Sequence, residues 1–533
     1  MIPASRRRFL ETLFGSAAAL AGCGGGGGDA GSPAPAPSPG PQPSPAVDGP
    51  AWTNFGGNAQ HTAQSAIAAQ DLAAIHWQAS VDLAPPYRPS GALLAHYAAP
   101  VITSHNTALV PVNTGTGFRV EARAGGNGVV IWSATTDYVM PPHNWVPSYN
   151  LALNSTNRVY APGAGGKLLF RDNADSASAN GWQTLVFYGA SAYNAAATSY
   201  DQTVFINTPL TVDTQGNVYF GFRVTGANPG NLVSGIARIA ADGTGSWVPA
   251  AAVAGDATTA KLATNAAPAL SNDGQTLYVV VNADSANNPQ AVQYGYLLAL
   301  DSISLALKRR IALVEPSPVG FARISDDGTA SPLVGPDGDV YIGVLEAGFG
   351  THNGRGWLLH FDAALTTAKT PGSFGWDNTP SIVPAAMVPN YSGGSSYLLL
   401  TKYNNYAGVG TGDGKNRVAV LDPHDVQADP VIGTVSVMRE VLTILGTTTD
   451  PAHADIGGVK EWCINTAAVD PATRSVLINS EDGYLYRWDL ASNTFTQRIR
   501  MNNGIGQSYT PTAIGADGTV YAVNNAAVFA VGR

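Results

Sequence analysis

The chain has 533 residues, of which only 12% are charged and 60 are glycine, and its formal net charge is −9. An average soluble protein has about 25% charged residues, so this composition excludes a coiled coil and favours many short strands joined by tight turns. The acidic balance of charge also excludes a basic surface for nucleic acid.

The N-terminus carries an export signal. Residues 5–10, Ser-Arg-Arg-Arg-Phe-Leu, match the twin-arginine pattern, with Arg6 and Arg7 as its arginine pair. The apolar run at 13–21 has the length of a signal-peptide core and is too short to cross a bilayer. Cleavage of residues 1–22 would remove three arginines and one glutamate and change the net charge from −9 to −11.

The signal ends in Leu-Ala-Gly-Cys at 20–23, which resembles the bacterial lipobox. In that pattern Cys23 is lipidated and becomes the first residue of the mature protein, which anchors the chain to a membrane without spanning it. Because residue 24 is glycine and not the aspartate of inner-membrane retention, the resemblance favours the outer membrane. The expected location is therefore periplasmic or at the cell surface. The alternative is an ordinary twin-arginine signal followed by a chance cysteine.

Residues 23–50 form a linker. A glycine run at 24–28 gives a flexible part, and the alternating prolines of 32–50 give a stiff, extended spacer. Folding is expected to begin near Trp52. The only other cysteine is Cys463, so no disulfide is expected within the folded domain, which suits a protein that folds before export.

From residue 51 to 533 the chain repeats one hairpin. Its clearest copy is Ser508–Asn524, where Thr510-Pro511 begins a strand, Asp517-Gly518 makes the turn, and Thr519-Val-Tyr-Ala-Val forms the second strand. An Asp-Gly pair supplies the positive φ angles that a tight hairpin needs. The eight copies lie at 99–112, 150–163, 208–221, 267–280, 331–343, 379–400, 466–480 and 508–524.

Each hairpin is followed by a third strand, and most by a fourth. The third strands are expected at 118–122, 167–172, 235–240, 296–301, 357–362, 418–422, 484–489 and 528–532. The fourth strands are expected at 129–134, 182–189, 245–250, 307–313, 432–438 and 495–500, while that of the fifth unit is not evident. Four-stranded units repeated at irregular spacing indicate blades with loop insertions.

The last unit ends at Arg533 without room for a fourth strand. Residues 74–82, Ala-Ile-His-Trp-Gln-Ala-Ser-Val-Asp, can supply it from the N-terminal side. Such pairing closes a ring and removes its open edges. The sequence therefore predicts an all-β domain, an eight-bladed β-propeller closed by an N-terminal strand, with seven blades as the alternative count.

The motif W52-x-x-F-G-G-N-x-x-H61-T62, the Pro-(x)4-Asp-Gly-x-Val-Tyr hairpins and the Leu-x-Ala-Leu-Asp third strands resemble the PQQ-binding-like β-propellers, the quinoprotein dehydrogenase-like group. The resemblance covers residues 51–533. It implies the propeller architecture. It leaves the chemistry open, because the group includes quinone-dependent alcohol and sugar dehydrogenases and also cofactor-free lipoproteins that serve as assembly scaffolds.

In a propeller, the loops that precede the first strand of each blade lie on one face, around the central channel. Here these loops hold aromatic and polar residues, whereas the strands are mostly Ala, Val, Leu and Thr. Aromatic faces and fixed polar groups suit a binding pocket, although such residues also fill gaps between blades and cap turns. The loop residues are His96, Tyr97, His143, Asn144, Trp145, Gln202, Asn207, Lys261, Asn265, Asp326, Asp327, Trp376, Asp377, Asn378, Glu461, Trp462, Cys463, Asn465, Gln507, Ser508 and Tyr509.

The resemblance implies a test of these loops against quinoprotein chemistry. PQQ, a planar tri-acid, needs a stacking ring, and Trp145, Trp376 or Trp462 could supply one. Calcium prefers oxygen ligands. The oxygen ligands available are Glu461, Asn465 and Asp377. A nearby carboxylate or imidazole could serve as the base; the expected catalytic set is Glu461, Asp377 and His143.

Three observations weaken that hypothesis. The chain has no adjacent cysteine pair and no Cys-x-x-Cys-His haem site, and the cations in these loops are few: Lys261, Lys460 and Lys402. A second enzymatic hypothesis, a polysaccharide lyase, would use His143, His96, Tyr149 and Tyr97 to move protons.

The sequence thus predicts an exported, lipid-anchored propeller that binds a small molecule, glycan or envelope protein at the channel. PQQ-dependent dehydrogenase activity is the main enzymatic possibility, and a non-catalytic envelope scaffold is the alternative. Three further features are expected to be structural. The Gly-rich stretch 400–417 is a surface insertion, Cys463 is a small buried packing residue, and the Asp-Gly pairs at 273, 337, 482 and 517 make hairpin turns.

Overall fold

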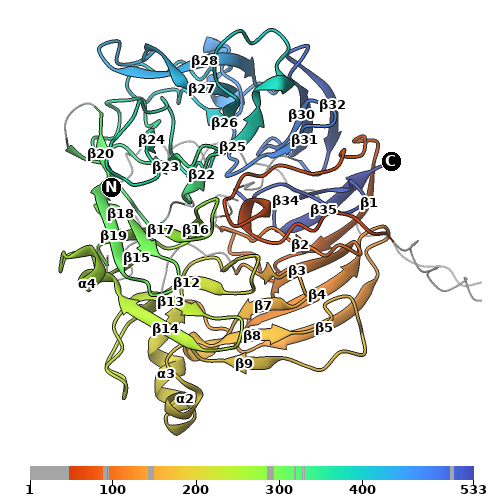
Figure 1. The fold of residues 1–533 in the computed structure, drawn as a ribbon. Helices are drawn as coiled ribbons and strands as arrows, with labels where there is room; N and C mark the ends of the chain where they lie inside the picture. Colours follow the sequence, from red (N-terminus) through yellow and green to blue (C-terminus); the bar gives the residue numbers. More distant parts are fainter. Residues whose placement is uncertain are drawn as a thin grey trace, which may run out of the picture.

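The computed structural model describes residues 47–87, 93, 95–141, 149–284, 293–316, 320–326, 328, 330–503 and 509–533. Eight antiparallel sheets stand around a central axis, each next to the sheet that follows it in the chain (Figure 1). The architecture is the predicted eight-bladed β-propeller, and the alternative count of seven is excluded. No helix of the described residues is long and apolar enough to span a membrane.

The first four blades are built from strands β2 to β19. Blade 1 contains β2 (Val101–Ile102), β3 (Thr107–Asn113), β4 (Phe118–Ala124) and β5 (Val130–Thr136); blade 2 contains β6 (Ala152–Leu153), β7 (Val159–Pro162), β8 (Leu168–Arg171) and β9 (Gln183–Leu185). Blade 3 contains β10 (Val204–Ile206), β11 (Thr211–Val212), β12 (Val218–Val224), β13 (Gly235–Ile239) and β14 (Gly245–Pro249); blade 4 contains β15 (Lys261–Leu262), β16 (Ala269–Leu270), β17 (Thr276–Asn282), β18 (Gly295–Asp301) and β19 (Leu307–Ala312).

The remaining blades use the rest of the chain and one early strand. Blade 5 contains β22 (Leu333–Val334), β23 (Val340–Val344) and β24 (Trp357–Phe361); blade 6 contains β25 (Ser381–Pro384), β26 (Tyr397–Tyr403), β27 (Arg417–Ala428) and β28 (Ser436–Leu445). Blade 7 contains β29 (Ala468–Asp470), β30 (Ser475–Asn479), β31 (Tyr484–Asp489) and β32 (Thr494–Arg500); blade 8 contains β33 (Ala513–Ile514), β34 (Val520–Asn524), β35 (Ala527–Gly532) and β1 (Ala74–Ser80).

Short elements connect the blades. A two-stranded arm, β20 (Val314–Glu315) and β21 (Gly320–Phe321), lies between blades 4 and 5. The helices are η1 (Phe55–Gly57), η2 (Ala164–Gly166), α2 (Ala190–Ala195), α3 (Ala197–Thr203), α4 (Ala250–Ala254), η3 (Ala385–Met387) and η4 (Pro451–Ile456).

The strands of a blade differ in burial because the blades pack face to face. Strand β30 is buried at every position, as its sequence Ser-Val-Leu-Ile-Asn requires, since the neighbouring blades cover both of its faces. Strand β32, at the rim, alternates between exposed and partly buried residues. The burial pattern along a strand therefore indicates whether the strand lies near the axis or at the rim.

Strand β1 closes the ring, as predicted. It pairs antiparallel with β35 from Ala74 opposite Gly532 to Ser80 opposite Ala527, with a bulge between Ile75 and Trp77 (Figure 1). The first and last parts of the fold share one sheet, and β1 covers the outer edge of β35 that would otherwise be unpaired.

Two units differ from the expectation. In blade 5, the described residues place isolated bridges, Leu358 to Gly372 and Phe361 to Ala368, where a fourth strand would lie. In blade 6, the fourth strand was expected at 432–438, but β28 covers Ser436–Leu445. The reason is that β27 continues past Asp422 through a bulge at 423–425, which lengthens the hairpin and moves its outer strand along the chain.

The segment 52–70 follows the inner strands of all eight blades in sequence order. Backbone hydrogen bonds join it to Ile102, Leu153, Leu270, Val334, Ile382, Val469 and Gly518, and the Asn54 side chain bonds both backbone groups of Val212. One chain segment is therefore bonded to every blade. We call this segment, residues 52–70, the inner girdle; it contains the motif around Trp52 and His61.

Candidate functional site

Two sets of loops meet on one face of the ring. In an antiparallel blade, the loop before the first strand and the loop after the second strand lie at the same end. The channel mouth, as we define it, is the face formed by these two sets of loops. It includes the residues before β2, β16, β22, β25, β29 and β33, and the residues at and after the ends of β17, β23, β26 and β30.

A continuous row of contacting side chains crosses this mouth. His96 Nδ1 lies 3.0 Å from Asn265 Nδ2, and the His96 ring meets the Tyr509 ring edge-on at 5.5 Å between centroids. The Tyr509 hydroxyl is 3.6 Å from the Cys463 sulfur, and Lys402 Nζ lies 5.3 Å from the Tyr509 ring centre. We call these five residues the polar belt.

The belt residues come from blades 6, 7, 8 and 1, which follow one another in the ring, and from blade 4, which is not next to any of them. His96 precedes blade 1, Asn265 lies in blade 4, and Tyr509, Cys463 and Lys402 come from blades 8, 7 and 6. All five are at most 5% exposed. Because blades 1 and 4 are not adjacent in the ring, the contact between His96 and Asn265 spans the channel and narrows it.

Asn265 reaches the belt because of its backbone. Its φ of +67° is in the left-handed region, which asparagine tolerates better than most residues. Its backbone N–H donates to the Asn207 carbonyl at 3.1 Å, and the Asn207 side chain donates in turn to the Leu262 carbonyl at 3.0 Å. The loop is therefore held by the preceding blade.

Two carboxylates stand beside the belt. Ligand atoms of Glu461, Cys463 and Glu481 all lie within 4.8 Å of one another, with the thiol buried and both glutamates half-buried. Burial raises the pKa of the Cys463 thiol well above its ordinary value, and the charges of Glu461 and Glu481 raise it further, whereas Lys402 opposes them. The thiol is thus protonated at neutral pH and is a poor nucleophile.

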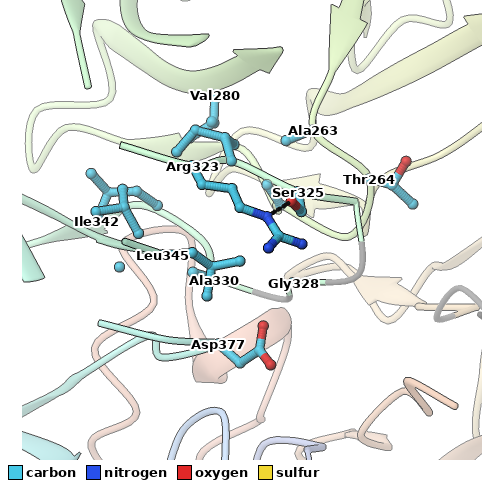
Figure 2. Close-up of a pocket in the computed structure, with 14 residues that line it drawn as sticks. Ala263, Thr264, Val280, Arg323, Ser325, Gly328, Ala330, Ile342, Leu345 and Asp377 are labelled. Atoms are coloured by element: carbon cyan, nitrogen blue, oxygen red, sulfur yellow. Dashed lines mark hydrogen bonds between the residues drawn. The ribbon is translucent and has the colours of Figure 1, made fainter. Parts of the chain in front are cut away.

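Asp377 lies in a different part of the mouth. It lines a cavity of about 30 Å³ with Arg323, Ser325 and Gly328, and Figure 2 shows Asp377 and Arg323 on opposite sides of it. Arg323 Nε donates to the Ser325 hydroxyl at 2.5 Å. A cavity of this size holds a few water molecules.

Lys261 is committed to a buried ion pair. Its Nζ lies 2.7 Å from Asp326 and 2.9 Å from Asn282 Oδ1, and the side chains of Lys261 and Asp326 are 0% and 3% exposed. Burial lowers the pKa of Lys261, and the attraction of Asp326 opposes that effect. This lysine neutralises its partner and does not offer a charge to a ligand.

The described tryptophans of the predicted set pack inside the blades. Trp462 is 1% exposed and lies 5.4 Å from the Tyr486 ring and 5.7 Å from the Phe495 ring. Trp376 is 3% exposed and meets Phe349 edge-on at 5.9 Å. Both therefore contribute buried core area.

Other predicted residues form hydrogen bonds within the fold. Asn378 donates its backbone N–H to Gly375 in a turn, and Asn465 accepts from the Thr466 hydroxyl at 3.1 Å. Tyr97 donates its hydroxyl to Asp82 at 2.7 Å, and Tyr149 donates to Thr136 at 3.0 Å. His143, Asn144, Trp145, Asp327, Gln507 and Ser508 lie outside the described residues, as do Cys23, Arg6 and Arg7.

Burial raises the pKa of Tyr97 and of Tyr149, and Asp82 raises that of Tyr97 further. The hydroxyls of Tyr97 and Tyr149 thus donate to Asp82 and Thr136, and the tyrosine whose ring contacts His96 is Tyr509, which the lyase hypothesis did not include.

A Ser–His–Asp set in the loops of blades 5 and 6 does not have the geometry of a nucleophile. His352 Nε2 lies 3.0 Å from Asp429 Oδ2, and Ser373 donates its hydroxyl hydrogen to that same carboxylate. All three are at most 2% exposed. Since the histidine and the serine share one acceptor, His352 cannot take the serine proton, and the set ties blade 5 to β27 and β28.

The described lining does not fit PQQ. A tri-acid needs cationic partners, but Lys261 is neutralised by Asp326, Lys460 lies 4.0 Å from Asp450, and Lys402 is buried against Tyr509. The side chains nearest the belt are carboxylates, and the two described tryptophans are packed in cores. The carboxylates beside the belt suit a cation better than an anion.

Glu481 was not among the predicted site residues, because the prediction considered only the loops that precede the first strand of each blade. It lies in the turn after β30, next to the Asp482-Gly483 pair that the sequence predicts as a hairpin. The available signal was topological: loops that follow second strands lie on the same face as loops that precede first strands.

Comparison with family models and with curated proteins finds no match. Among solved structures, the chain is similar to a europium-containing methanol dehydrogenase, with a TM-score of 0.54 and 10% identity over 88% of each chain. It is also similar to the quinohemoprotein alcohol dehydrogenase from Comamonas testosteroni, with a TM-score of 0.53 and 12% identity over 91% of this chain and 81% of that one.

The likeness to BamB from Moraxella catarrhalis, with a TM-score of 0.39 and 11% identity over 86% of this chain and 100% of that one, carries no argument. At these identities the likeness concerns the fold. The chain is an eight-bladed β-propeller with the architecture of the quinoprotein alcohol dehydrogenases.

Proposed function

We propose that this protein is an exported, lipid-anchored propeller that binds a small ligand at the channel mouth, through a divalent cation held by Glu461 and Glu481. The observation that carries the proposal is the approach of Glu461, Cys463 and Glu481 ligand atoms to within 4.8 Å at one end of the polar belt. Two carboxylates and a sulfur this close form a ligand set of the kind that divalent cations bind, and such a cation would share their charge with the nearby Lys402.

The belt would then provide the other side of the ligand site. The Tyr509 hydroxyl, 3.6 Å from the Cys463 sulfur, offers a polar atom next to the cation, and hydroxyl or carbonyl oxygens of a ligand can complete the coordination. A hydroxyl-rich small molecule or glycan suits this combination better than an organic anion. The lipid on Cys23 and the Gly/Pro linker of 23–50 would hold the domain away from the membrane.

Titration calorimetry with Ca²⁺ tests the cation step. We expect one site in the purified mature protein, and at least tenfold weaker binding when Glu461→Gln and Glu481→Gln are combined, because both charges are lost. Asp455→Asn, which removes an exposed carboxylate of η4, is the matched control and should bind as the wild type does. Unchanged affinity in the double variant would contradict the proposal.

The enzymatic alternative is a quinone-dependent dehydrogenase. The fold favours this alternative, but the described residues of the channel mouth do not. We expect PQQ added with Ca²⁺ to raise the melting temperature no further than Ca²⁺ alone, and to support no dye-linked alcohol oxidation. A further rise together with alcohol oxidation would show that the site takes a quinone and would overturn our choice of ligand class.

A scaffold function is favoured by one observation at the arm β20–β21. Val314, Phe321 and Tyr294 are 38%, 45% and 44% exposed on and beside the arm β20–β21, and the rings of Phe321 and Tyr294 are in contact at 5.5 Å. An exposed apolar group of this kind suits contact with a protein. A photoreactive residue at 321 that crosslinks one envelope protein in cells, with no crosslink from exposed position 303, would support this function.

A further inference from the structure

A second group of metal-binding side chains lies on the face opposite the channel mouth. Asp337 and Asp339 flank Gly338 in the turn between β22 and β23 of blade 5. His424 lies in the bulge 423–425 of β27, where the register of blade 6 shifts between Asp422 and Val426. The bulge carries His424 out of the strand and onto the neighbouring blade's turn.

The three residues are close enough to share one ion. His424 Nε2 lies 3.2 Å from Asp337 Oδ2 and 3.9 Å from Asp339 Oδ2, and ligand atoms of all three lie within 4.8 Å of one another. Around a tetrahedral zinc ion with bonds of about 2.0–2.1 Å, neighbouring ligand atoms are roughly 3.3 Å apart. The 3.2 Å spacing of His424 and Asp337 is close to that value, whereas the 3.9 Å spacing of His424 and Asp339 is longer, so Asp339 would move toward a bound ion.

Hydrogen bonding determines which nitrogen of His424 is available. The Ser395 hydroxyl donates its single hydrogen to Asp422 at 2.5 Å and lies 3.0 Å from His424 Nδ1. Because that hydrogen is already used, the contact requires Nδ1–H to donate to the serine oxygen. The other nitrogen, Nε2, faces the Asp337 carboxylate, where either a proton or a metal ion can join the two groups.

The same arrangement occurs at His360. Its Nδ1 lies 3.2 Å from the Thr370 carbonyl, which can only accept, and its Nε2 lies 2.9 Å from Asp339 Oδ2. Asp337 is oriented as well, since its Oδ1 accepts from the Tyr397 hydroxyl at 2.8 Å and from the Asp339 N–H at 3.0 Å. Partners behind the ligands in this way fix the geometry of metal sites.

We propose that Asp337, Asp339 and His424 bind a divalent transition-metal ion of the zinc class at the junction of blades 5 and 6, with His360 completing or supporting the site. Imidazole and carboxylate together suit zinc and its neighbours, whereas calcium takes oxygen ligands alone. The side chains of His424 and Asp337 are 39% and 36% exposed, so an ion can enter from solvent. The inference is independent of the function proposed for the mouth.

One residue competes with the ion. Lys369 Nζ lies 2.5 Å from Asp339 Oδ2, and its side chain is 36% exposed. A bound ion would take over the charge of Asp339 and release this lysine to solvent. Removing the Lys369 charge should therefore strengthen metal binding, whereas removing a ligand should weaken it. An ordinary ion-pair network predicts no effect of either change on zinc.

The test is zinc titration by calorimetry and equilibrium dialysis at pH 7.5, in a Glu461→Gln, Glu481→Gln background that weakens the mouth. We expect one zinc ion per chain. His424→Ala and Asp337→Asn should each lower the affinity at least about tenfold, and Lys369→Met should raise it. His105→Ala is the matched control, because exposed His105 also pairs with an aspartate, Asp48, at 2.8 Å, and it should bind as the background does.

Cobalt gives a second readout that does not depend on affinity. Co²⁺ bound to imidazole and carboxylates in a four-coordinate site absorbs in the visible range, and this absorption should disappear in His424→Ala and persist in His105→Ala. Circular dichroism of each variant shows that it is folded. Equal zinc binding by His424→Ala and His105→Ala, or no zinc binding by the folded background protein, would overturn the proposal.

Discussion

At the scale of single residues, His61 shows how the fold selects a protonation state. It is 0% exposed, its Nδ1 lies 2.7 Å from the Pro332 carbonyl, and its ring meets Phe55 edge-on at 5.2 Å. Burial lowers the pKa of His61 to about 4, and the hydrogen bond to Pro332 only partly opposes this. The residue is therefore folded as neutral imidazole.

This histidine should make stability depend on pH. In the unfolded chain His61 titrates with a pKa near 6.5, above its folded value, so its contribution is present above pH 6.5 and is lost as the pH falls toward 4. From pH 7 to pH 5 the free energy of unfolding should fall by about 2 kcal/mol through this residue. Melting temperatures of wild type and His61→Gln measured across this range should converge as the pH falls, and a constant difference would contradict the account.

Cys463 should behave as a buried thiol and not as a catalytic one. Burial and two nearby glutamates raise its pKa, and it is 3% exposed. A thiol reagent at pH 8 should modify the folded protein far more slowly than the same protein in denaturant, because thiolate and access are both lacking. The Cys463→Ser variant measures modification at other groups. Rapid modification of the folded protein would show that the Cys463 thiol is accessible to the reagent.

At the scale of elements, the inner girdle is expected to hold the blades in register. Asn54 acts there like a strand residue, since its Oδ1 accepts from Val212 N–H at 2.7 Å and its Nδ2 donates to the Val212 carbonyl at 3.2 Å. Asn54 is 3% exposed, so removal of its amide leaves both backbone groups without a partner.

Asn54→Ala should lower the free energy of unfolding by about 1–3 kcal/mol, the cost of leaving buried polar groups unsatisfied. Asn127→Ala, at an exposed turn where Oδ1 accepts from Val129 N–H, should change it by less than about 0.5 kcal/mol. Denaturant unfolding followed by fluorescence compares the two variants. Equal effects would mean that the girdle does not bear on stability.

The elements also show what could be predicted from sequence. Repeated Asp-Gly hairpins and apolar periodicity predicted the blades and the closing strand, because those signals are local. The bulge at 423–425 was not predicted, since it depends on the contact of His424 with another blade. Hairpin geometry explains Gly338, but it gave no sign that Asp337 and Asp339 face an imidazole.

The mouth was predicted only in part for a similar reason. Residues in the loops before first strands, such as His96 and Tyr509, contact one another. Sequence reasoning could not separate these from Trp462 and Trp376, which occupy equivalent loops but pack inward. Whether an aromatic ring faces the channel or the gap between blades depends on neighbouring blades, and one chain segment contains no information on that choice.

At the scale of the whole molecule, ring closure should decide whether the protein folds as one unit. Six residue pairs join β1 to β35, from Ala74 with Gly532 to Ser80 with Ala527. Deletion of the N-terminal region through residue 80 would expose the edge of β35 and remove the girdle, which favours aggregation. Deletion of 23–46 should leave the melting temperature and the monomer mass in light scattering unchanged. A monomeric product with the wild-type melting temperature after the longer deletion would contradict this account.

The central claim is that the ring brings Glu461 and Glu481 together around a divalent cation. Anomalous diffraction from crystals of the mature protein grown with Cd²⁺, which accepts carboxylate and thiolate ligands, tests it most directly. We expect a peak about 2.3–2.6 Å from oxygens of both glutamates, a typical length for oxygen ligands of large divalent ions. An ordered Glu461 and Glu481 with no anomalous peak between them would contradict the claim.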